Sequence, residues 1–240
     1  MTLLAIETSG PVCSVALLVG GVPVCTRAEA GGANHARLLP RFVDELLAEA
    51  RTRRLSLEAV ALSEGPGSYT GLRIGSSMAK GLCYGLGIPL IAIPTPLVLC
   101  ASYAAHIGRL PADAPSLPAD PLLCPMTDAR RMEVYTALYT PDLRPVMPIQ
   151  ACVIDASSFA DRLAQSPVVF FGDGADKCRS VICSPAARFV SGILPDAQHM
   201  GVLAEAGYGR TVSGKDIAYY NPFYLKDFVA APSHVKGLHP

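Results

Sequence analysis

The stretch from Ser63 to Gly75, SEGPGSYTGLRIG, lies between two apolar runs and carries four glycines. Such a loop can hold a phosphate, because glycine leaves backbone N–H groups unshielded and a following helix presents its positive end. It can equally be a tight turn at Gly65-Pro66-Gly67, with Ser68 or Thr70 capping the helix. The stretch matches neither the Walker pattern nor a clean dinucleotide fingerprint. On local grounds both interpretations stay open.

The segments around this loop alternate between strand and helix patterns. Asn34, a residue that favours a helix start, precedes one run of apolar residues at helical spacing, and the glycine loop precedes another. The expected order is three strands (3–8, 12–19, 22–27), a helix (35–50), a strand (59–64), a helix (70–86), a strand (90–93) and a helix (97–106). This order predicts an α/β fold with a mixed sheet flanked by helices, the half-domain of actin-like, sugar-kinase-like and ribonuclease-H-like proteins.

A proline-rich stretch at 108–121 separates this half from a second, shorter one. We therefore expect an N-terminal subdomain at 1–107 and a smaller C-terminal subdomain at 108–240. In the second half the expected strands are 122–128, 132–139, 146–154 and 168–171, with helices after Ser157 and at 196–206. Asp128 and Glu133 flank a double arginine at a strand connection, where surface ion pairs are the ordinary explanation.

Composition narrows the class of protein. Lys plus Arg equals Asp plus Glu at 20 each, so no overall charge draws the chain to nucleic acid. The eight cysteines form no Cys-x-x-Cys pair and the five histidines form no helical pair, so we predict no metal site and no cofactor. The most apolar long stretch, 89–105, is interrupted by prolines and is a poor match to a membrane-spanning helix. We expect a cytoplasmic protein.

An actin-like ATPase needs an acidic residue on its first strand and a second glycine-rich loop. Glu7-Thr8-Ser9-Gly10 approximates the first feature, but the only second-half candidate, Gly172-Asp173-Gly174, would repel phosphate. A glycine pair to hold the nucleoside is missing after Gly192, and Glu7 is expected to hold the strand-end turn by hydrogen bonds. We predict at most a vestigial nucleotide site, formed by Glu7, Thr8, Ser9, Gly65, Gly67, Ser68 and Arg73.

The two helices of the first half suggest a surface for another protein. The first carries an apolar stripe wide enough to exceed what its own sheet needs, and the second has small residues four apart, so that a neighbouring helix could approach closely. Packing of this small-residue face on the chain's own sheet is the alternative. The predicted partner interface consists of His35, Leu38, Leu39, Phe42, Leu46, Gly71, Leu72, Gly75, Ser76, Ala79 and Cys83.

Several motifs in this order resemble the bacterial TsaB (YeaZ) family. They are LLAIETSGPVCSVALL (3–18), NHARLLPRFVDELL (34–47), SEGPGSYTGLRIGSSMAKGLCYGLGIPLIAIPT (63–95), TDARRMEVYTALY (127–139), FFGDGADKC (170–178) and YYNPFYLKDF (219–228). The resemblance covers nearly the whole chain and is strongest over residues 1 to about 100.

The resemblance implies an actin-like (ASKHA) fold of two subdomains and a role in making N6-threonylcarbamoyladenosine (t6A) at position 37 of tRNAs that read codons beginning with A. It implies that the chain is an essential, non-catalytic partner of the transferase TsaD. The ATPase TsaE would join the complex, tRNA would be met only through it, and the isolated chain would form a homodimer. The family's docking surface uses the helices at about 35–50 and 70–85. The chain departs from the catalytic relative, whose metal-binding His-x-x-x-His pair has no counterpart at Pro94–Leu99.

Our leading hypothesis is a scaffold subunit of this tRNA-modifying complex, in which the glycine loop is chiefly a turn and a cap. The alternative is an independent actin-like ATPase or kinase that uses Glu7 and the loop. A glycoprotein peptidase lacks an identifiable metal pair or nucleophile–base pair in this sequence. A stand-alone RNA-binding module is disfavoured by the zero net charge.

Overall fold

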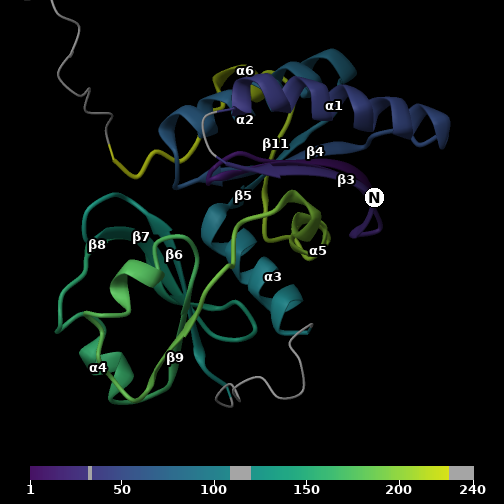
Figure 1. The fold of residues 1–240 in the computed structure, drawn as a ribbon. Coiled ribbons are helices and arrows are strands. Elements are labelled where there is room, and N and C mark those ends of the chain that lie inside the picture. Colours follow the sequence, from purple (N-terminus) through teal and green to yellow (C-terminus); the bar gives the residue numbers. More distant parts are fainter. Residues whose placement is uncertain (32–33, 109–119, 227–240) are drawn as a thin grey trace, which may run out of the picture.

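The computed structural model describes residues 1–31, 34–108 and 120–226, which form two mixed β-sheets with helices around and between them (Figure 1). In spatial order the first sheet contains β11 (Arg210–Val212), β5 (Leu90–Pro94), β4 (Ala59–Gly65), β1 (Thr2–Glu7), β2 (Val12–Val19) and β3 (Val22–Ala30). The second contains β10 (Ala187–Val190), β9 (Val168–Phe171), β6 (Leu122–Asp128), β7 (Glu133–Tyr139) and β8 (Pro145–Val153).

Each sheet combines antiparallel hairpin strands with parallel strands. In the first sheet β1 pairs antiparallel with β2 and parallel with β4, and β4 pairs parallel with β5. In the second, β7 lies antiparallel between β6 and β8, while β9 runs parallel to β6. The predicted α/β, actin-like architecture of two mixed sheets flanked by helices is confirmed.

The helices form the outer and middle layers. They are α1 (His35–Thr52), α2 (Tyr69–Leu86), α3 (Thr95–Ile107), α4 (Ala160–Leu163), α5 (Met200–Glu205) and α6 (Asp216–Tyr219). Figure 1 shows α1 and α2 on one face of the first sheet and α3 and α5 on the other, toward the second sheet. The residues of β1 alternate accordingly: Leu3 and Ala5 pack with α3 and α5, whereas Leu4 and Ile6 pack with α1 and α2. With both faces covered, β1 is buried along its whole length.

The second half departs more from the expected pattern than the first. The helix expected at 196–206 is a short 3₁₀ turn (Ala197–His199) followed by α5, and the helix after Ser157 has only four residues. Strands β10 and β11 were not foreseen. Because β11 pairs with β5, a segment of the second half completes the first sheet. The division at 107/108 stays a prediction.

The glycine loop serves as the turn and helix cap that the local alternative described. The Ser68 hydroxyl accepts a hydrogen bond from the Gly71 amide at 3.2 Å, and the Ser68 amide donates to the Ser9 carbonyl at 2.7 Å. By contrast Asn34, expected to cap α1, occupies the N-cap position without a side-chain hydrogen bond.

The start of α2 lies directly against the end of β1. The Thr8 hydroxyl donates to the Gly71 carbonyl oxygen at 2.8 Å, and a Cβ atom at Gly75 would overlap that hydroxyl. A methyl group at Gly71 would likewise overlap the Thr8 carbonyl oxygen. The absence of side chains at these two positions therefore sets how closely α2 approaches the sheet.

This contact can be tested with Gly75→Ala. We expect the variant to lose about 1–3 kcal/mol of unfolding free energy in a urea titration, because the new methyl group forces α2 away from Thr8. Gly85→Ala in the same helix is the matched control: a Cβ there meets nothing within 4 Å, so the variant should be as stable as wild type or slightly more stable. Equal destabilisation of both variants would contradict the role of this contact.

Candidate functional site

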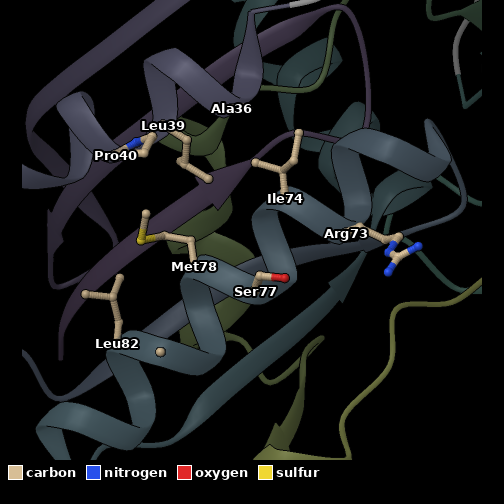
Figure 2. A pocket seen from close by; sticks show the side chains of 9 residues that line it. Ala36, Leu39, Pro40, Arg73, Ile74, Ser77, Met78 and Leu82 are labelled. Carbon is tan, nitrogen blue, oxygen red and sulfur yellow. The ribbon is translucent and has the colours of Figure 1, made fainter.

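A groove runs along the surface between α1 and α2. It has a volume of about 590 Å³ and is lined by Ala36, Leu39, Pro40, Arg73, Ile74, Ser77, Met78, Gly81 and Leu82. Figure 2 shows that the side chains of Ile74, Met78 and Leu82 point toward α1, while Arg73 points away at one end. These three α2 residues recur at intervals of four, so they form a continuous apolar wall. The wall is only half-buried, which leaves apolar surface available to a further protein.

The residues predicted for the partner interface lie mostly beneath this groove and not on its surface. Of that set only Leu39 lines the groove, and its side chain is itself fully buried. The other ten residues of the set are also buried: His35, Leu38, Phe42, Leu46, Gly71, Leu72, Gly75, Ser76, Ala79 and Cys83. The small-residue face of α2 therefore packs on the chain's own sheet, the alternative that the sequence left open, and the contact of these residues with a partner stays a prediction.

The reason is that both helix faces expected to be exposed pack on the chain's own sheet. These are the apolar stripe of α1 and the small-residue face of α2. Leu38, Phe42 and Leu46 of α1 pack with Val15 and Leu17 in one core cluster. Gly71 and Gly75 meet Thr8, and Ala79 is fully buried. A charge introduced at Ala79 would disrupt this core before it could affect any interface.

The residues that do line the groove had a signal in the sequence. Ile74, Met78 and Leu82 are spaced by four, one position before the small residues Gly75, Ala79 and Cys83. On an α-helix this offset turns the apolar row about 100° away from the small-residue row. Sequence reasoning attended to the small residues, which the sheet covers, and missed the neighbouring row.

The expected vestigial nucleotide site centres on Glu7, whose carboxylate is completely buried at the end of β1. One carboxylate oxygen, Oε1, accepts hydrogen bonds from the amide and the hydroxyl of Ser9, both at 2.5 Å. The other oxygen, Oε2, has no hydrogen-bond partner within the described residues. Burial raises the pKa of Glu7 from 4.5 to about 7, with a smaller contribution from Asp196, and the hydrogen bonds from Ser9 and Ser63 oppose this rise.

Two backbone amides of the glycine loop bind oxygen atoms of the chain itself. The amides of Ser68 and Gly71 donate to Ser9 and Ser68, and a Cβ at Gly67 would overlap the Ser9 carbonyl oxygen. Gly65 lies against the backbone of Phe223, a residue from the far end of the described chain. At Gly65 and Gly67 the loop therefore packs directly on backbone of the chain itself.

Arg73 and the second glycine loop, at 172–174, do not join the group of residues around Glu7. The Arg73 guanidinium lies 5.6 Å from the centre of the Tyr69 ring and borders the α1–α2 groove. Asp173, between Gly172 and Gly174, accepts a hydrogen bond from the Asp128 amide at 3.1 Å in the second sheet. The candidate nucleotide residues are thus brought together only in part, around Glu7, Thr8, Ser9 and the loop.

Within residues 1–31, 34–108 and 120–226, no group of three or more His, Cys, Asp or Glu side chains is arranged to hold a metal ion. Across the same part of the chain, no helix combines the length and the apolar character that crossing a membrane requires.

Comparison with known proteins assigns the family. A family model described as TsaD, tRNA N6-adenosine threonylcarbamoyltransferase, matches residues 26–231. The chain is 33% identical to the tRNA threonylcarbamoyladenosine biosynthesis protein TsaB of Bacillus subtilis over 177 residues, which make up 72% of this chain and 71% of that protein. The chain belongs to the TsaB (YeaZ) family.

Other TsaB family members match over different lengths. The TsaB protein of Haemophilus influenzae is 41% identical over 93 residues, a stretch that covers only 39% of each chain. The structure of YeaZ from Pseudomonas aeruginosa superposes with a TM-score of 0.71 at 27% identity and covers 93% of this chain and 99% of that one. A second structure, described as an uncharacterized protein with similarity to peptidase YEAZ from Pseudomonas aeruginosa, gives a TM-score of 0.74 at 26% identity.

The buried carboxyl group of Glu7 makes a prediction about pH. Its pKa is higher in the folded protein than in the unfolded chain, so the folded state holds the proton more tightly between pH 4.5 and about 7. The resulting stabilisation is complete below pH 4.5 and is lost as the pH rises through about 7. In Glu7→Gln this dependence should disappear, because the amide does not titrate.

The measurement is the unfolding free energy in urea at several pH values from acidic to slightly alkaline. Relative to Glu7→Gln, the wild type should lose stability with rising pH at up to about 1.4 kcal/mol per pH unit. Parallel pH profiles for the two proteins would show that Glu7 does not titrate in this range.

Proposed function

We propose that this chain is a non-catalytic partner subunit of a TsaD-type transferase in the synthesis of t6A at position 37 of tRNA. The observation that carries the proposal is the apolar groove between α1 and α2, the two helices that cover one face of the first sheet, whose α2 wall is only half-buried. Membership of the TsaB family, whose relatives are named for threonylcarbamoyladenosine biosynthesis, supports the pathway.

The shape of the groove favours a helical partner. Two adjacent helices that expose an apolar row can pack against two helices of another protein by fitting ridges into grooves. Ile74, Met78 and Leu82 supply such a row, and the exposed Arg73 at its end could pair with an acidic side chain of the partner. An apolar centre with a charged rim is the ordinary composition of a specific interface. The same surface would support a homodimer when the partner is absent.

The state of the nucleotide-like region supports a non-catalytic role. The loop amides of Ser68 and Gly71 already bind the chain's own oxygen atoms, and Glu7 holds Ser9. In this proposal the transferase supplies the chemistry and the tRNA is met only within the complex, which TsaE would join. The TsaB-type subunit contributes a rigid surface through α2, whose angle is set by the contact with Thr8.

Two substitutions in the groove test the docking surface. Met78→Glu places a charge in the apolar wall, and Ser77→Arg adds bulk at an exposed position without reaching the core. Each should weaken association with the cognate TsaD by at least about thirtyfold, the effect of losing a residue central to an interface. Isothermal titration calorimetry of the purified proteins measures this.

The matched control is Val153→Glu, since Val153 is an exposed apolar residue on β8, away from the groove. Its affinity for TsaD should equal that of wild type, and all variants should keep the wild-type circular dichroism spectrum. Normal binding by folded Met78→Glu and Ser77→Arg would overturn the proposal. Tight binding of ATP with magnesium and turnover by the isolated chain would favour the ATPase alternative.

A further inference from the structure

In the connection between β6 and β7, the backbone conformation is unfavourable for the residues that occupy it. Arg130 and Arg131 both lie in the left-handed region, with φ values of 70° and 49°. Glycine and asparagine adopt this conformation readily, whereas a long side chain such as arginine does so at an energetic cost. Two consecutive arginines therefore stand where the turn itself would favour Asn-Gly.

Ion pairing does not explain the two arginines. The neighbouring carboxylates of Asp128 and Glu133 are paired with Lys177 and Lys226, and Lys177 also donates to the Glu133 carbonyl oxygen at 2.7 Å. Within the described residues, no hydrogen bond or ion pair involves either arginine side chain. Surface ion pairs do engage Asp128 and Glu133, as expected, but their partners are the two lysines and not the arginines.

The result is a pair of exposed arginine side chains without an ion-pair partner among the described residues, on a chain whose overall charge is zero. The two lysines pair with the two carboxylates, so neither carboxylate forms an ion pair with Arg130 or Arg131. Asp173, a further acid near this turn, is exposed and accepts a hydrogen bond from the Asp128 amide, and within the described residues no ion pair joins it to either arginine. The tip of the hairpin thus exposes two consecutive arginines on a short, hydrogen-bonded turn.

We propose that Arg130 and Arg131 bind backbone phosphates of the tRNA when the chain is in complex with its transferase, an inference that rests on the proposed function. The guanidinium group matches the phosphate oxygens with two parallel hydrogen bonds and stays charged at any physiological pH. Such contacts position an RNA without reading its sequence. Two contacts are too few for binding by the isolated chain, which agrees with its zero net charge.

The decisive variant is Arg130→Asn/Arg131→Gly, which removes both charges and gives the turn the residues that it favours. If the arginines had a structural role, this variant would be less stable than wild type. If they bind RNA, it should melt at the same temperature or higher, form the complex with TsaD normally and bind tRNA less tightly. Arg130→Lys/Arg131→Lys keeps the charges and should retain most of the affinity.

The matched control is Arg51→Gln/Arg54→Gly at the end of α1, which also removes two exposed positive charges. Arg54 has a φ of 56°, so the control includes the same relief of a left-handed backbone. Its complex with TsaD should bind tRNA as the wild-type complex does. A loss of affinity in the control equal to that of the hairpin variant would overturn the proposal, because the effect would then come from net charge alone.

Binding is measured by fluorescence anisotropy with unmodified tRNA and the purified complex, at several salt concentrations between about 50 and about 200 mM. We expect the slope of log K against log salt to fall by about 2 in the Asn-Gly variant, one for each lost phosphate contact. An unchanged affinity and slope in a complex that still forms would overturn this inference and leave the docking proposal intact. Failure of the wild-type chain to associate with TsaD would overturn both.

Discussion

The contact between the first turn of α2 and the end of β1 sets the geometry on which the rest of the molecule depends. The Thr8 hydroxyl binds the Gly71 carbonyl oxygen, and neither Gly71 nor Gly75 leaves room for a side chain between helix and strand. Because the helix lies this close to the strand, its small residues are buried against the sheet. The next row along the helix, Ile74, Met78 and Leu82, faces α1 and forms the wall of the groove.

The same close packing changes the character of the glycine loop. In a phosphate-binding loop the backbone amides point into an open space, and the helix dipole adds to their attraction for an anion. Here Ser9 and Ser68 accept those hydrogen bonds, and Phe223 approaches Gly65 from the other end of the chain. The actin-like architecture is kept, while Gly65 and Gly67 of the loop lie against the chain's own backbone.

Two of the energetic costs that the structure tolerates lie at Glu7 and at the arginine pair. Glu7 keeps one carboxylate oxygen buried without a partner among the described residues, and its raised pKa reflects the cost of burying a charge. Arg130 and Arg131 adopt a backbone conformation that their side chains disfavour. Both features go against local preferences, one for solvated charge and one for backbone conformation, without a visible gain in stability. In natural proteins such positions are typically functional sites.

Much of the first half could be predicted from local patterns, because those patterns report directly on backbone geometry. Apolar spacing predicted α1, α2 and α3 nearly to their ends, and the serine before the glycine-rich helix does cap it. The second half was harder. Its short elements β10, β11 and α4 have three or four residues each, too few for a periodic pattern to be distinguished from chance.

The sequence by itself determined the fold class, the order of the main elements and the resemblance to a family, since all three follow from short-range spacing and from motifs contiguous in the chain. Only the tertiary structure decided which side of α2 is exposed and which cations lack partners. Those properties depend on neighbours that are distant in sequence. Thr8 closes the small-residue face of α2, and Lys177 and Lys226 take the carboxylates beside the arginine pair. Burial and ion pairing are properties of a packed structure, so one residue position along a helix was enough to separate the expected docking face from the observed groove.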